Sequence, residues 1–184
     1  FVPEHRPKAQ TDHGMVYDSG NQYVLMLGEY EESGSPWPST TWTWDGEDWT
    51  RLYPETVFGA REGFGITYDC NREKVVVYGG YGRSTPTSNE KKYLLETWEW
   101  DGVDWRLIET EHAPSGRGLG EMTFDATNGR CIYFGGLDGG LHNDTWAYDG
   151  TDWTEIGLDQ RYPNADYGYS TAYDSHRHRL VLTM

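Results

Sequence analysis

The feature that most constrains this chain is an internal repeat with a period of about fifty residues. An aromatic residue followed by aspartate recurs four times, at Tyr17-Asp18, Tyr68-Asp69, Phe124-Asp125 and Tyr173-Asp174. A glycine follows the first three aspartates after ten residues, and a later Thr-Trp step precedes a further tryptophan by a constant seven residues. Self-similarity at a fixed period is typical of architectures in which each repeat forms one supersecondary unit.

Each repeat is expected to form four short strands, A to D, in an antiparallel meander. Strands A and B are mostly apolar, strand C alternates aromatic with polar residues, and an Asp-Gly step turns the chain into strand D. Helix formers are scarce beside 23 Gly, 14 Tyr and 9 Trp, which is typical of an all-β protein with many tight turns. We therefore expect four repeats, the last of them partial, at approximately 12–54, 64–108, 118–157 and 167–184.

A four-stranded sheet of this size is too small to stand alone, so its aromatic face needs a neighbour. Radial stacking of such sheets predicts an all-β fold, a β-propeller of four-stranded antiparallel blades with about three and a half blades present, which is an incomplete ring. Because propellers typically contain about 4 to 8 blades, further blades from the same or another chain are expected. The tryptophans that open strand D should occupy equivalent buried positions, at Trp49, Trp105 and Trp153.

The motifs resemble those of the kelch family of β-propellers. The resemblance rests on Gly-Gly after strand B, an aromatic residue in strand C, the strand D tryptophan and an arginine before the aromatic-Asp pair: Gly79-Gly80, Gly135-Gly136, Trp100, Tyr148, Arg61 and Arg117. The W-D-G-x-D-W pattern is similar to kelch-like repeats of bacterial secreted and surface proteins, which implies an extracellular or cell-surface location. The chain departs from the family pattern at Gln10, Glu29 and Asp166. The resemblance implies a fold and leaves the ligand open, because a fold does not determine a function.

Charge and hydropathy narrow the classes of partner. The formal net charge is −15, from 30 acidic and 15 basic side chains, so most of the surface would repel a nucleic-acid backbone or an anionic membrane. No stretch approaches the roughly eighteen apolar residues of a membrane span. We therefore expect no nucleic-acid partner and no membrane insertion.

Candidate binding residues lie in the loops on one side of the predicted meander. The A–B and C–D turns keep their lengths, whereas the B–C loops at 29–40, 81–96 and 137–144 differ, and loops that vary on a rigid scaffold commonly carry recognition. The D–A loops open on the same side. Together they provide Tyr30, Trp37, Arg61, Tyr81, Arg83, Tyr93, Arg117, Asp138 and His142. Aromatic residues with arginines suit a protein partner, or a glycan; alternatively, these are ordinary loop residues in which the two repeat arginines tie neighbouring blades together.

The sequence offers no complete set of residues for a known catalytic site. Copper radical oxidases share the resemblance, but they need a cysteine beside a tyrosine at one metal, and Cys70 and Cys131 lie outside the B–C and D–A loops. His176 and His178 have no third metal ligand nearby, and residues 137–144 lack a calcium-loop spacing. We therefore predict no catalytic residue, metal or cofactor. The favoured function is non-catalytic protein–protein recognition; the alternatives are a glycan-binding module, or part of a copper radical oxidase-like enzyme whose site lies in other repeats.

Overall fold

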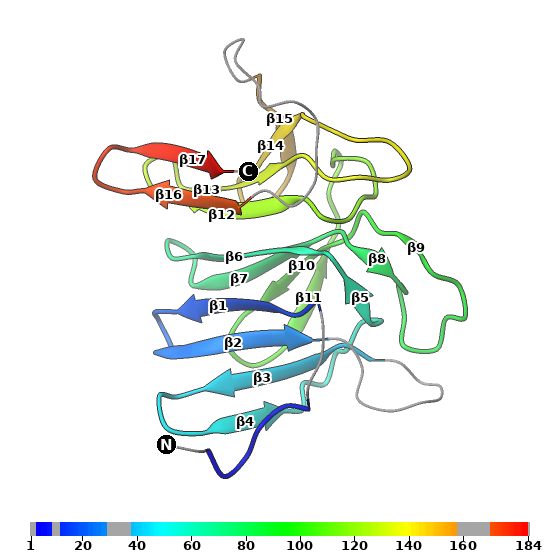
Figure 1. Ribbon diagram of the computed structural model, residues 1–184, viewed down its shortest axis with the longest axis vertical. Coiled ribbons are helices and arrows are strands. Elements are labelled where there is room, and N and C mark those ends of the chain that lie inside the picture. Colours follow the sequence, from blue (N-terminus) through cyan, green and yellow to red (C-terminus); the bar gives the residue numbers. More distant parts are fainter. Residues whose placement is uncertain (1–2, 9–11, 29–37, 158–169, 184) are drawn as a thin grey trace.

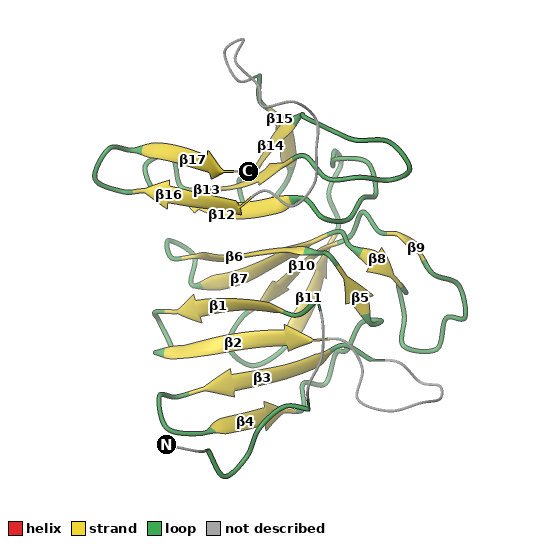
Figure 2. Ribbon diagram, in the orientation of Figure 1, coloured by secondary structure: helices red, strands yellow, loops and turns green. Residues whose placement is uncertain are grey.

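The structure is a computed structural model that describes residues 3–8, 12–28, 38–157 and 170–183. Within these ranges every regular element is a β-strand and none is a helix (Figure 2). The described part of the chain accordingly contains no helix that could cross a membrane. The prediction of an all-β chain is confirmed.

Three four-stranded antiparallel sheets and one two-stranded sheet follow one another along the chain. The first sheet contains β1 (Gly14–Asp18), β2 (Tyr23–Gly28), β3 (Thr40–Trp44) and β4 (Trp49–Leu52). The second sheet contains β6 (Gly65–Asp69), β7 (Lys74–Tyr78), β10 (Thr97–Trp100) and β11 (Trp105–Ile108). The third sheet contains β12 (Glu121–Asp125), β13 (Arg130–Phe134), β14 (Thr145–Tyr148) and β15 (Trp153–Glu155). The two-stranded sheet consists of β16 (Ser170–Asp174) and β17 (Arg179–Thr183), and in every sheet the strands lie side by side in chain order, as a meander requires.

A small three-stranded sheet lies beside the second sheet and was not predicted. It is made of β5 (Arg61–Glu62), β8 (Tyr81–Gly82) and β9 (Lys92–Tyr93), with β8 in the middle. Strand β5 belongs to the loop before strand A of the second repeat, and β8 and β9 belong to the long loop between its strands B and C. This small sheet therefore gives a rigid backbone to part of the loop region that the sequence marks as variable.

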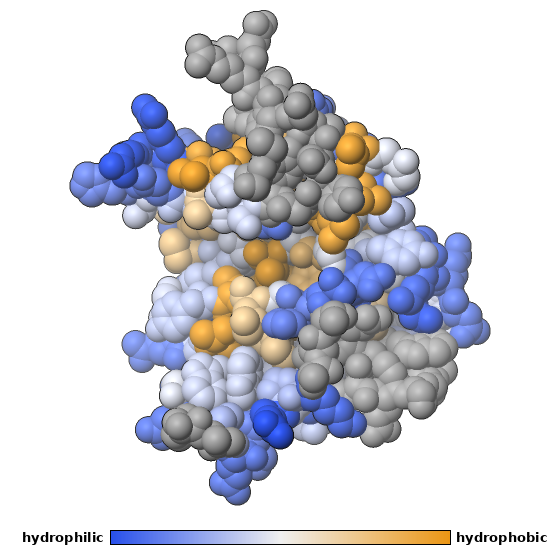
Figure 3. Space-filling model, in the orientation of Figure 1, coloured by the Kyte–Doolittle hydropathy of each residue, from blue (hydrophilic) through white to orange (hydrophobic). Residues whose placement is uncertain are grey.

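The sheets stack face to face (Figure 1), and the first strands β1, β6, β12 and β16 lie next to one another from sheet to sheet. Because side chains alternate along a strand, each central sheet packs on two neighbours. Val75 and Val77 of β7 join the aliphatic residues of β2 in one core, whereas Val76 and Tyr78 join the third sheet in another. Figure 3 shows apolar side chains gathered between the stacked sheets and charged ones toward the edges.

The D-G-x-D-W pattern builds the turn between strands C and D. In the second sheet the Asp101 carboxylate accepts the backbone N–H groups of Val103 and Asp104, both at 2.9 Å, while Gly102 adopts a φ of 97° that favours glycine. The second aspartate accepts the backbone N–H of Thr56 at 2.8 Å, from the linker that leaves the preceding sheet. Each turn therefore fixes its own hairpin and also holds the chain entering from the sheet before it.

The strand D tryptophans join consecutive sheets. The indole N–H of Trp105 donates to Thr41 Oγ1 at 2.9 Å, and that of Trp153 donates to Thr97 Oγ1 at 2.8 Å. Both tryptophans are buried, at 2% and 1% exposure. The prediction of three equivalent buried tryptophans is wrong for Trp49, which is partly exposed, because among the described residues no sheet packs on its face.

Candidate functional site

The two arginines that were predicted to lie on the binding face are buried. Arg61 donates to Glu96 Oε2 at 2.7 Å and to the backbone carbonyl of Gly79 at 3.2 Å. Arg117 repeats this arrangement in the next repeat, with the Asp144 carboxylate and the carbonyl of Gly135. Their guanidinium groups hold the loop ends together inside each repeat and are not open to a partner.

The acidic residue of each arrangement also orients a strand C tryptophan. The indole N–H groups of Trp98 and Trp146 donate to Glu96 at 3.1 Å and to Asp144 at 2.7 Å. Burial opposes ionisation of Asp144, but the hydrogen bonds from Arg117 and Trp146 outweigh it and lower the pKa of this carboxyl. Burial lowers the pKa of the Arg61 guanidinium, against the raising effect of the Glu96 charge. The contacts of Arg61 with Glu96 and of Arg117 with Asp144 therefore stabilise the fold.

Two of the predicted binding residues, Tyr81 and Tyr93, come together at a hollow. They are opposite partners on β8 and β9, their ring centroids lie 5.0 Å apart, and Tyr81 is exposed. Glu62 of β5 is the cross-strand partner of Tyr81, so all three residues belong to one face of the three-stranded sheet. This tyrosine hollow has a volume of about 290 Å³ and is lined by Asp12, Glu62, Gly63, Tyr81, Tyr93, Gly118, Leu119 and Leu137.

One position in each of three repeats contributes to the tyrosine hollow with unusual backbone geometry. Asp12, Gly63 and Leu119 each lie five residues before the aromatic-Asp pair, and their φ angles are 57°, 62° and 59°. Glycine adopts this conformation freely, whereas leucine does so at a cost of roughly 1–2 kcal/mol. A Cβ on Gly63 would lie 2.8 Å from the Leu119 side chain, so glycine at one repeat makes room for leucine from the next. Backbone strain of this kind is concentrated at functional sites.

The lining of the tyrosine hollow has one sign of charge. Its lining residues include the acidic residues Asp12 and Glu62, two tyrosines, and the apolar residues Leu119 and Leu137. Among the described residues that line it there is no lysine, arginine or histidine. The hollow therefore suits a group that is positively charged at one end and apolar along its length. Sequence reasoning missed Asp12, Glu62 and Leu119. The glycine at position 63 is the one sequence signal for the left-handed backbone conformation that Asp12, Gly63 and Leu119 share.

The remaining predicted residues do not join this hollow. His142 Nε2 lies 2.9 Å from Asp138 Oδ1, and Ser115 donates to the other oxygen of Asp138 at 3.0 Å. The hydrogen bond with His142 lowers the pKa of Asp138 more than any other contact. Arg83 is partly buried, and its backbone N–H donates to the carbonyl of Ala60 at 3.0 Å. Tyr30 and Trp37 lie outside the described residues.

The histidines, cysteines and carboxylates of the described ranges do not form a metal site, and both cysteines are free thiols. No group of three or more His, Cys, Asp or Glu side chains in them could hold a metal ion. Cys131 is a free thiol whose pKa is raised by burial, and Cys70 is free and exposed. His178 Nδ1 lies 2.8 Å from Thr127 Oγ1.

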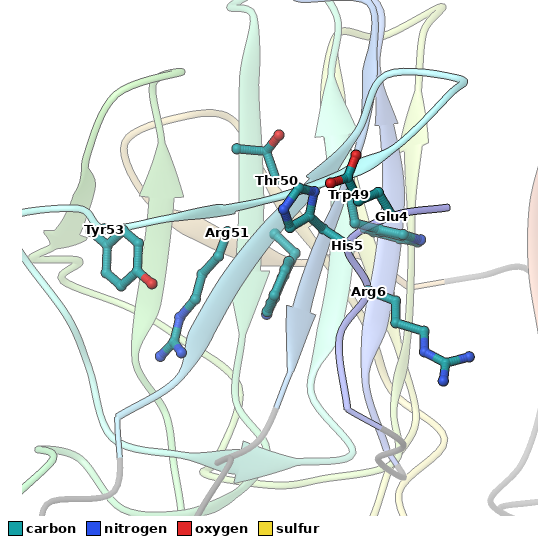
Figure 4. A pocket seen from close by; sticks show the side chains of 8 residues that line it. Glu4, His5, Arg6, Trp49, Thr50, Arg51 and Tyr53 are labelled. Atoms are coloured by element: carbon teal, nitrogen blue, oxygen red, sulfur yellow. The ribbon is translucent and has the colours of Figure 1, made fainter. Parts of the chain in front are cut away.

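A larger hollow, of about 610 Å³, lies on the outer face of the first sheet. It is lined by Glu4, His5, Arg6, Trp42, Trp49, Thr50, Arg51 and Tyr53 (Figure 4). In Figure 4, His5 and Trp49 lie toward one side of the hollow and Tyr53 toward the other, with Arg51 between them. We call it the first-sheet hollow.

Comparison with known proteins gives a fold and no family. No family model matches the chain, and no curated protein matches it. Among solved structures the chain is similar to one described as "Structure of YjhT", with a TM-score of 0.59 and 14% sequence identity. The similarity covers 85% of this chain and 48% of that one, so the chain spans about half the length of the structure it matches. At this identity the likeness shows the fold alone.

Proposed function

We propose that the stacked sheets are blades of a kelch-like β-propeller and that the protein is a non-catalytic binding module for a protein partner. The tyrosine hollow is the centre of recognition, and it receives a basic side chain, lysine or arginine, from that partner. The observation that carries the proposal is the cross-strand set Glu62, Tyr81 and Tyr93 on one face of the three-stranded sheet.

The chemistry of the hollow supports a basic side chain over other groups. A cation over a tyrosine face gains about 0.5–2 kcal/mol, and nearby carboxylates attract it further. The net charge of −15 draws basic partners toward the whole molecule and speeds their encounter. At about 290 Å³ the hollow falls at the low end of the roughly 300–1,000 Å³ typical of small-molecule sites. A secreted or cell-surface location is part of the same proposal and follows from the kelch-like resemblance.

Titration calorimetry with a short glycine-rich peptide that carries one central lysine tests the proposal. The peptide should bind, and Tyr81→Ala should weaken binding by about 1–2 kcal/mol because the aromatic face is lost. Glu62→Gln should weaken it by about 0.5–1 kcal/mol and reduce its salt dependence. The same peptide with glutamine in place of lysine should not bind.

Matched controls lie on the opposite side of the sheets, in the C–D turns. Glu47→Gln, Val103→Ala and Thr151→Ala should leave peptide binding unchanged. Weakening by these variants alone would contradict the choice of face. If a neutral oligosaccharide binds, Tyr81→Ala abolishes that binding and Glu62→Gln does not, the hollow is a glycan site and the basic-side-chain proposal is wrong.

A further inference from the structure

The three complete sheets have equivalent faces, but their burial differs. Five positions on the leading face of the second and third sheets are covered by the sheet before them, and these positions have direct counterparts in the first sheet. Tyr68 and Phe124 are 8% and 9% exposed, whereas their counterpart Tyr17 is 55% exposed. Met122 is 7% exposed, whereas its counterpart Met15 is 53% exposed. At Met15 and Tyr17 the leading face of the first sheet therefore presents to solvent the kind of side chains that the other two sheets bury, and Trp44 and Trp49 on the same face are partly exposed.

This face also contains a buried donor without an acceptor. Trp42 is the counterpart of Trp98 and Trp146, whose indole N–H groups bind the acidic residue two positions earlier. Thr40 stands at that position in the first repeat, and Trp42 Nε1 has no hydrogen-bond partner among the described residues. Trp42 is 8% exposed and lines the first-sheet hollow. A buried indole N–H without a partner costs free energy, so an acceptor from another segment would stabilise this face.

The path of the N-terminal segment indicates what covers the face. In the second and third sheets, the linker that leaves the preceding sheet bonds to the C–D turn, through Thr56 to Asp104 and through His112 to Asp152, both at 2.8 Å. His5 makes the same backbone bond to Asp48, at 2.9 Å. Pro3-Glu4 also repeats Pro54-Glu55 at the matching positions. The residues before the first sheet thus follow the route of a linker arriving from another sheet.

We propose that the leading face of the first sheet, Met15, Tyr17, Trp42, Trp44 and Trp49, receives a further four-stranded sheet of the same repeat, which precedes Pro3 in the polypeptide. That sheet offers two aliphatic residues from its strand B, as Leu25 and Leu27 do toward the second sheet, and a threonine hydroxyl for the Trp49 indole N–H. The linker geometry favours a sheet of the same polypeptide over a second copy, because a docked copy would not be joined through Pro3. The inference concerns a face distinct from the tyrosine hollow.

A chain extended at its N-terminus tests the proposal. A second copy of residues 12–51 is added immediately before Phe1. Phe1 then follows the added copy in the way that Leu52 follows residue 51 in the chain itself. The measurement is hydrogen exchange of the Trp49 indole N–H by NMR, assigned with Trp49→Phe. In the unextended chain this proton should exchange quickly. In the extended chain its exchange rate should fall to a value similar to that of the Trp105 indole N–H, which is the internal reference. Thr41→Val within the added copy should restore fast exchange, whereas Thr41→Ser there should preserve slow exchange.

Three results would overturn the proposal. Unchanged exchange of the Trp49 indole in the extended chain would show that the face does not accept a sheet of this repeat. An extended chain that fails to fold, or melts below the unextended one, would show the same. If sedimentation shows that the unextended chain self-associates and Trp49 becomes protected as it does, the face belongs to a second copy.

Discussion

The first sheet and the second sheet contain nearly the same C–D hairpin, TWTWDGEDW and TWEWDGVDW, yet the structure treats them differently. In the second sheet Trp100 and Trp105 are buried against the first sheet, and Trp105 donates to a threonine across the boundary. In the first sheet the counterparts Trp44 and Trp49 are partly exposed. The burial of the last two tryptophans of this motif therefore depends on a neighbouring sheet, whereas the first tryptophan is buried in both sheets, at 8% exposure for Trp42 and 7% for Trp98.

Removing the strand D tryptophan should have the largest effect, and it tests this comparison directly. Trp105→Ala should lower the free energy of unfolding by about 3–5 kcal/mol, because it leaves a cavity between two sheets. Trp49→Ala should cost less, about 1–2 kcal/mol, because Trp49 is partly exposed and no described sheet packs on its face. Urea unfolding of both variants gives the two numbers. Equal losses would mean that Trp49 is covered in solution.

The arginine of the second and third repeats provides the next largest effect. Arg117→Met should cost about 2–4 kcal/mol, because it leaves Asp144, which is partly buried, without its cation while Trp146 still depends on that carboxylate. The double variant Arg117→Met with Asp144→Asn should recover part of the loss. Thermal and urea unfolding measure both, and a loss below about 0.5 kcal/mol would show that the pair does not brace the loops.

A smaller effect should distinguish a threonine whose hydroxyl accepts a hydrogen bond from one whose hydroxyl has no partner among the described residues. Thr97→Val removes the acceptor of the Trp153 N–H and should cost about 1–2 kcal/mol. The matched variant is Thr145→Val, at the equivalent position of the third sheet, where the hydroxyl is buried without a hydrogen-bond partner among the described residues. It should be neutral or slightly stabilising, because it removes a buried polar group that gains nothing. If both variants destabilise equally, Thr145 has an acceptor or donor partner in solution.

The smallest effect concerns pH and the linkers. The hydrogen bond with Asp152 raises the pKa of His112, and the bonds from His112 lower the pKa of Asp152. The histidine contribution to stability is present below its unfolded pKa and is lost as pH rises through the raised folded value. The aspartate contribution is present above its unfolded pKa and is lost as pH falls through the lowered folded value. The pair should therefore stabilise most between about pH 4 and pH 6.5.

His112→Thr, which copies Thr56 of the preceding linker, removes the imidazole and keeps the backbone bond to Asp152. It should lose the pH dependence that comes from His112, and keep the part of the Asp152 dependence that comes from the backbone bond. The measurement is the unfolding temperature of the wild type and the variant, from well below to well above this pH window. The two proteins should differ most inside the window and approach one another below the lowered pKa of Asp152 and above the raised pKa of His112. A difference that does not change with pH would show that the ion pair contributes nothing beyond the backbone bond.

Much of the fold was predictable because its signals are local and periodic. The intervals from Asp18 to Gly28 and from Trp42 to Trp49 are repeated without change, and the strands lie where these intervals put them. The two-residue strands β5, β8 and β9 were not predictable, because they are too short to show alternation. Their pairing depends on contacts between loops that only the folded chain brings together.

The candidate site was only partly predictable. The spacing of the repeat motifs predicts which loop a residue belongs to, but it does not predict the direction in which the side chain points. Tyr81 and Tyr93 were both selected as loop aromatics, and the structure pairs them. Arg61 was selected on the same grounds, but it is on β5, where alternation turns it inward and turns Glu62 toward the hollow. Leu119 gave no signal, since nothing in its residue type suggests a left-handed backbone.

The bond between tryptophan and threonine gives a direction to the two joints between the four-stranded sheets. Each sheet offers an indole N–H on one face and a hydroxyl acceptor on the other, as Trp105 with Thr41 and Trp153 with Thr97 show. Two identical faces cannot satisfy each other, so association through these faces is heterologous and cannot give an isologous pair with twofold symmetry. Heterologous contacts either close into a ring or continue as an open filament. A sheet that covers Trp49 thus also removes one of the two complementary faces through which copies of this protein could join head to tail.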